Sequence, residues 1–156
     1  MKKLISLLLV AIVTLSFTGI IASAYENQTS VVHQTIEHFE DGGYFVTTIE
    51  SDTTDSLRLA RASSSKSGSK TAIYYNSKGV AQWSLKVTGK FTYTGSTSSA
   101  TSASKTLTYH VSGCSSSSNG AYTSGRSAVG YATVKHGGLS TYKSVTLSCS
   151  ANGTLS

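Results

Sequence analysis

A strict alternation of apolar and polar side chains runs through the middle of the chain. Between residues 81 and 93 every even position is polar, and every odd position is apolar or glycine. The odd positions are Ala81, Trp83, Leu85, Val87, Gly89, Phe91 and Tyr93. A period of two over this length predicts a β-strand with one buried face, and the glycine within it marks a bulge or bend.

The residues before this strand predict a partner for it. An Ile-Tyr-Tyr run is followed by a Ser-Lys-Gly loop at residues 77–79, which is typical of a hairpin. Pairing across the loop sets Ile73 beside Trp83 and Tyr75 beside Ala81. The aromatic side chains of this hairpin then share the buried face, which favours core packing over an exposed platform that stacks on sugars or bases.

Two more hairpins are predicted at the ends of the chain. Runs of β-favouring residues at 31–36 and 44–49 flank Glu-Asp-Gly-Gly, a sequence of residue types that is typical of a turn. Near the other end, Gly137-Gly138 separates strands at 126–136 and 139–149. Direct pairing across these glycines places the small residues Ala128, Gly130, Ala132 and Val134 opposite Leu147, Val145, Lys143 and Thr141.

With one further alternating run at 107–111, these segments amount to about six short strands without helical periodicity after residue 62. They predict an all-β, antiparallel sandwich, Ig-like or a small open barrel, with an N-terminal β-hairpin segment. Residues 51–61 contain Leu, Ala and Arg and suggest a short helical turn. Residues 62–69 have the Ser/Gly-rich composition of a linker, so we place a boundary near residue 62.

The first 24 residues predict an export signal. Lys2 and Lys3 precede an apolar run from Leu4 to Ile21, and Ala22-Ser23-Ala24 supplies a small-residue cleavage pattern. We expect cleavage after Ala24 and a secreted protein without a transmembrane anchor.

Charge divides the remainder into two parts. All seven acidic residues lie within residues 25–61 against two arginines, which gives this segment a charge of −5. Residues 62–156 contain no Asp or Glu and carry a charge of +9, from Lys66, Lys70, Lys78, Lys86, Lys90, Lys105, Arg126, Lys135 and Lys143. Without carboxylates, this part lacks the groups for glycoside hydrolysis, for a Ca²⁺ or Mg²⁺ cage, or for orienting a catalytic histidine. We therefore expect a non-catalytic domain with no cofactor and no metal.

A carboxylate-free, basic domain attracts polyanions. Lys86 and Lys90 share a face of the predicted strand, about 13 Å apart at ~3.3 Å per residue. They are the centre of a predicted anion-binding stripe, with Lys70, Lys105 and Lys143 as neighbours. For an exported protein the expected partners are anionic envelope or surface polymers, not a specific nucleic acid. The alternative is that the lysines only keep a Ser/Thr-rich β-protein soluble.

A second hypothesis concerns the acidic segment. Arg58 and Arg61 offer sites for a trypsin-like protease. Residues 25–61 could then be a pro-segment that masks the basic domain until cleavage after Arg61 releases an effector, toxin-like or bacteriocin-like. The competing interpretation is that the hairpin adds two strands to the same sheet.

Cys114 and Cys149 are the only cysteines. In an exported protein they predict a disulfide, which would close a loop of about 36 residues and contribute roughly 4 kcal/mol. Two free thiols or a metal site are the alternatives, although no paired histidines stand at zinc-ligand spacing. Serine–histidine catalysis stays open only because serines are abundant.

Several motifs also carry a resemblance. They are residues 37–44 (Glu-His-Phe-Glu-Asp-Gly-Gly-Tyr), 46–49, 67–71 (Ser-Gly-Ser-Lys-Thr), 75–79, Trp83, 87–95 and 147–156. In these segments, which span nearly the whole mature part, the chain resembles a family of small exported proteins of Gram-positive bacteria whose domain has no known function. The family's first cysteine stands soon after the counterpart of Thr94-Gly95, whereas here it is Cys114. The resemblance implies no activity and no catalytic residue.

Overall fold

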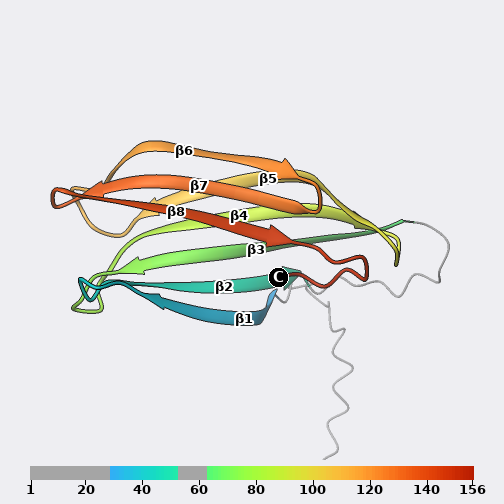
Figure 1. Ribbon diagram of the computed structural model, residues 1–156, viewed down its shortest axis with the longest axis horizontal. Coiled ribbons are helices and arrows are strands. Elements are labelled where there is room, and N and C mark those ends of the chain that lie inside the picture. Colours follow the sequence, from blue (N-terminus) through green and yellow to red (C-terminus); the bar gives the residue numbers. More distant parts are fainter. Residues whose placement is uncertain (1–28, 53–62) are drawn as a thin grey trace, which may run out of the picture.

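The computed structural model describes residues 29–52 and 63–156, in which every regular element is a β-strand (Figure 1). The strands are β1 (Thr29–His38), β2 (Tyr44–Asp52), β3 (Ser64–Tyr75), β4 (Ala81–Tyr93), β5 (Ser98–Tyr109), β6 (Ser115–Ser124), β7 (Ser127–His136) and β8 (Leu139–Ser148). Two antiparallel sheets, β1-β2-β3-β4-β5 and β6-β7-β8, face each other as a sandwich. The predicted all-β antiparallel sandwich is confirmed, and the sheets do not close into a barrel.

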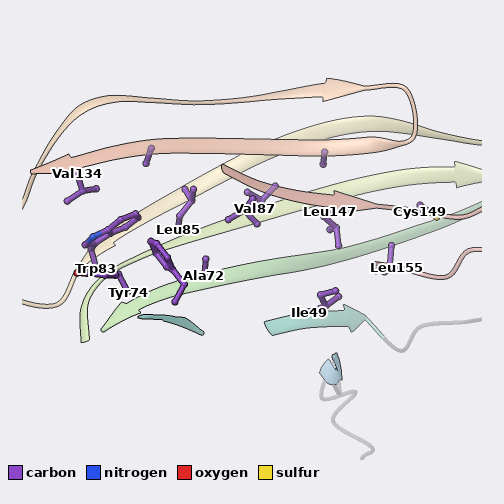
Figure 2. Close-up of a cluster of buried hydrophobic side chains, with 14 of the residues drawn as sticks. Ile49, Ala72, Tyr74, Trp83, Leu85, Val87, Val134, Leu147, Cys149 and Leu155 are labelled. Carbon is purple, nitrogen blue, oxygen red and sulfur yellow. The ribbon is translucent and has the colours of Figure 1, made fainter. Parts of the chain in front are cut away.

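The hydrophobic core lies between the two sheets (Figure 2). Its largest fully buried side chains include Trp83, Phe45, Phe91, Leu85 and Leu147. The smaller sheet contacts β3, β4 and β5 and leaves β1 and part of β2 uncovered. Because the larger sheet is wider, part of its inner face lies beyond the edge of the smaller sheet and is not covered by it.

The predicted alternation in β4 is confirmed, since its odd positions from Trp83 to Phe91 are buried. Gly89 is required by close packing, because a Cβ there would lie 2.6 Å from the Phe91 ring and 2.8 Å from the Cβ of Ala128. The bulge itself falls one residue later, between Lys90 and Phe91. Gly89 therefore allows the two sheets to approach closely, and the predicted bend lies next to it.

The β3–β4 register differs from the prediction by one bulge. Tyr75 pairs with Ala81 as expected, but a register shift next to it sets Tyr74, and not Ile73, beside Trp83. Tyr75 consequently lies on the outer face, where its ring stacks on that of Tyr44 at 5.0 Å. The prediction that Tyr75 and Ile73 share the buried face with the tryptophan was wrong, because a single bulge exchanges the two faces of a strand.

Both predicted terminal hairpins are present. β1 pairs with β2 around the turn at residues 40–43, and β7 pairs with β8 across Gly137-Gly138 in the predicted register. Both of these glycines have positive φ, 54° and 84°, which suits a two-residue hairpin turn.

The prediction of a linker at residues 62–69 is wrong for most of this segment. β3 begins at Ser64, so residues 64–69 form a strand and not a linker. β2 hydrogen-bonds to β3, which makes the N-terminal hairpin continuous with the larger sheet. The predicted signal peptide with its Ala24 site, most of the predicted helical turn, and Arg61 lie outside the described residues.

The predicted disulfide is wrong. Cys114 immediately precedes β6, whose first residue pairs with Lys135, whereas the Cys149 N–H donates to the carbonyl oxygen of Arg126. The two cysteines thus lie at opposite ends of β7, roughly 30 Å apart at ~3.3 Å per residue. A disulfide needs Cα atoms within about 7 Å, and both thiols are free.

We expect denatured, unreduced protein to take up two alkylating groups in an intact-mass measurement. In the native protein alkylation should be slow, because burial raises the pKa of both the Cys114 and Cys149 thiols and so lowers their thiolate fraction. A denatured protein that reacts only after reduction would contradict the free-thiol structure.

Candidate functional site

An open groove lies where the larger sheet extends past the edge of the smaller one. It has a volume of about 480 Å³. Its lining residues come from β1, β2, β3 and the C-terminal segment, and they are His33, Thr35, Thr47, Ile49, Lys70, Leu155 and Ser156. Register explains why they meet, since His33 pairs with Ile49 on β2, which pairs with Lys70 on β3. The groove therefore combines hydroxyl groups, the His33 imidazole, two apolar side chains and the Lys70 ammonium.

Lys70 is the distinctive group of this groove. Its side chain is half-buried and has neither a hydrogen bond nor an ion pair with any other described residue. Burial, reinforced by the positive charge of Lys143, lowers the pKa of Lys70 from its usual range. An anion that enters the groove would stabilise this half-buried ammonium, which has no carboxylate partner among the described residues.

Lys143 spans from β8 to β1 near one end of the groove. Its Nζ forms an ion pair with Oε2 of Glu37 and lies 4.4 Å from the centroid of the Phe45 ring. Only 16% of the Lys143 side chain is exposed, whereas Glu37 is 58% exposed, so solvent still screens the ion pair, and the contact with the Phe45 ring adds to it. It joins the free edge of the smaller sheet to the uncovered part of the larger one.

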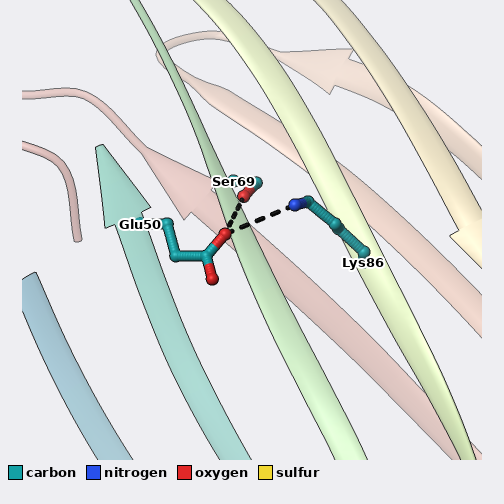
Figure 3. A network of polar contacts seen from close by, with 3 residues as sticks. All are labelled: Glu50, Ser69 and Lys86. Atoms are coloured by element: carbon teal, nitrogen blue, oxygen red, sulfur yellow. Dashed lines mark hydrogen bonds and ion pairs between the residues drawn. The ribbon is translucent and has the colours of Figure 1, made fainter. Parts of the chain in front are cut away.

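A second ion pair connects the acidic hairpin to the outer face of the larger sheet (Figure 3). Lys86 Nζ lies 3.3 Å from Glu50 Oε2, and the same oxygen accepts a hydrogen bond from Ser69 Oγ at 3.1 Å. Glu37 and Glu50 of the hairpin thus each neutralise one lysine of the basic part.

The five lysines of the predicted stripe do not form one surface. Lys86 and Lys90 lie on the outer face of β4, whereas Lys70 and Lys143 lie on the groove side. Lys105 pairs with Val87 on the inner side of β5 and is half-buried near β7. The predicted lysines divide in this way because alternate positions of a strand point to opposite faces.

Six cations have no carboxylate partner among the residues that the structure describes. They are Lys70, Lys78, Lys90, Lys105, Arg126 and Lys135. Of these, Lys78, Lys90, Arg126 and Lys135 are exposed. Their positions on several elements provide a dispersed positive surface, and Lys70 is the one that lines the groove.

A second hollow lies at the end of the sandwich where three turns meet. It has a volume of about 300 Å³, and Asp41, Asn76, Tyr74, Trp83 and His136 are among its lining residues. The Asp41 carboxylate accepts the Gly43 N–H, and the Asn76 side chain accepts two N–H groups of its own turn. These polar groups hold the turns in place, which explains their presence without a ligand.

Within the described residues, one histidine ring nitrogen lies within hydrogen-bond distance of a serine hydroxyl, as in a serine–histidine catalytic pair. His110 Nε2 lies 3.1 Å from Ser84 Oγ. No carboxylate in the described ranges hydrogen-bonds to this histidine, and Ser84 lies within β4 with 9% of its surface exposed. Residues 29–52 and 63–156 likewise contain no cluster of three metal-ligating side chains.

Within the described part of the chain, no helix is long and apolar enough to cross a bilayer.

The comparisons with known proteins find no relative. No protein-family model matches the chain, and neither a curated protein nor a solved structure matches it. The resemblance to the exported Gram-positive family therefore stays a prediction.

Proposed function

We propose that this chain is a secreted, non-catalytic binding domain that associates with anionic polymers of the cell envelope or surface. The supporting observation is the uneven pairing of charge. The hairpin's Glu37 and Glu50 each neutralise one lysine, while exposed cations on several elements have no carboxylate within the described ranges. Such a surface binds polyanions by releasing their counterions, without recognising a sequence.

Retention on immobilised poly(glycerol phosphate) tests this proposal. We expect elution at a defined salt concentration, with log affinity falling linearly with log salt. Replacing Lys90, Arg126 and Lys135 together with glutamine should reduce the slope by up to about three, since each contact releases about one counterion. The matched control exchanges Lys and Arg at the same positions, which preserves charge, and it should retain the slope. Equal salt dependence of both variants would contradict the proposal.

The processed-effector alternative has one observation in its favour. The acidic hairpin forms ion pairs with two lysines of the basic part, as a mask would. However, Phe45 and Ile49 of the same hairpin are 0% and 3% exposed and belong to the core. Removal of residues 25–61 would expose this apolar surface, so the alternative requires that the core hold without β2.

A further inference from the structure

The free edge of β8 already carries the beginning of another strand. Ser148 N–H donates to the carbonyl oxygen of Ser156 at 2.9 Å, and Ser156 N–H donates back to Ser148 at 3.0 Å. Cys149 and Leu155 form an antiparallel bridge. The chain thus turns at residues 150–154 and runs antiparallel to β8 for a few residues, on the side away from β7 (Figure 1).

Beyond this short return, the edge of β8 is unpaired in the described part of the chain. In an antiparallel strand, the backbone groups of alternate residues point to the same side. Because Ser148 bonds outward, the N–H and C=O groups of Thr146 and Ser144 also point to the free edge. β8 pairs with β7 on its other side only, so these groups are available to one more strand.

The groove adjoins the path of that strand, because Leu155 and Ser156, which pair with Cys149 and Ser148, line its wall. Thr47, Ile49 and Lys70 of the larger sheet line it as well. Towards the other end, Lys143 spans to Glu37. From Leu147, the first residue beyond the return, to Lys143 the edge measures roughly 14 Å at ~3.4 Å per residue, which is the span of five extended residues.

We propose that this groove binds a short, extended peptide that adds an antiparallel strand to β8 and places a carboxylate on Lys70. Main-chain hydrogen bonds to the edge supply affinity, and alternate side chains of the added strand face the larger sheet. A Glu or Asp opposite Leu147 or Val145 faces inward, towards the half-buried Lys70 ammonium, which has no carboxylate partner among the described residues. The occupant is therefore an acidic segment of β-strand conformation.

The inference goes beyond the association with envelope polymers, because that association uses exposed cations outside the groove. It also predicts a conflict between stability and binding. Lys70→Met removes a half-buried charge that no carboxylate of residues 29–52 or 63–156 neutralises, so it should raise the denaturation midpoint while it weakens the peptide complex. A purely structural role of Lys70 would not produce opposite changes in stability and affinity.

The probe is the capped peptide acetyl-Thr-Val-Glu-Val-Thr-amide, added to the full-length protein and followed by NMR. We expect the backbone amides of Ser144 and Thr146 to shift, and the same peptide with Gln for Glu to bind about tenfold more weakly or worse. Lys70→Met should cause a similar loss, whereas Lys90→Met, on the outer face, should leave the affinity unchanged.

Blocking the edge gives an independent test. Ser144→Pro removes one outward N–H without removing a bond to β7, which an edge strand tolerates, and it should abolish binding. Ser144→Ala keeps the N–H and should bind normally. Equal binding by the Glu and Gln peptides, or Lys70-dependent binding of a short poly(glycerol phosphate) without peptide binding, would overturn the inference.

Discussion

Replacing Phe45 with alanine is expected to lower the free energy of unfolding by about 3–5 kcal/mol, the usual cost of removing a buried phenylalanine ring. The ring is fully buried and lies 5.3 Å from the Trp83 ring, edge-on, and 5.2 Å from the Tyr74 ring. The Lys143 ammonium lies over it at 4.4 Å. The substitution therefore creates a cavity and removes a cation–π contact together.

Denaturant unfolding of the full-length protein measures this effect. The matched control is Ile36→Ala on β1, where the side chain is 57% exposed and the expected cost is below about 1 kcal/mol. A detachable acidic mask would make both variants equally mild, because its loss would leave the remaining core intact. A large cost for Phe45→Ala and a small one for Ile36→Ala would show that β2 belongs to the cooperative fold.

Gly130→Ala is expected to destabilise the protein by about 1–3 kcal/mol through overpacking between the sheets. A Cβ at this position of β7 would lie 2.4 Å from Cγ2 of Val87 on β4. Both positions are buried, so neither strand can relieve the clash by turning a side chain into solvent. The cost thus measures how closely the sheets approach at this point.

A double-mutant cycle identifies the cause. Val87→Ala removes the atom that the new methyl group meets, at the cost of its own cavity. The double variant should be more stable than the sum of the two single changes by about 1–3 kcal/mol, measured by denaturant unfolding. Strict additivity would mean that the approach of Val87 is not what excludes a side chain at Gly130.

The parts of the fold that depend on local pattern could be predicted from the sequence alone. The alternation in β4 indicated its buried face, because side chains of a strand point alternately to its two sides. Gly137-Gly138 predicted both the hairpin and its register, since a two-residue loop leaves one way to pair the flanking strands. Turn chemistry before β2 likewise predicted the first hairpin.

Strands of small polar residues were not predictable in this way. β6 begins with four serines, and the first part of β3 reads as a flexible linker. A run of serines shows no hydrophobic periodicity, and serine has no strong preference for β-strands. These segments become strands because β7 and β4 offer them backbone partners, which only the assembled sheets reveal.

The candidate site likewise depends on how the two sheets pack. Lys70 and Lys143 were named from charge alone, but the influence of the Lys143 charge on Lys70 depends on the packing of β8 over β3. The sequence also could not show that one sheet is wider than the other, and this difference opens the groove. The cysteines illustrate the same limit, because export predicted a disulfide while the direction of β7 holds the two thiols at opposite ends. Local pattern fixes the faces and turns of strands, whereas distances between strands follow from how the sheets stack.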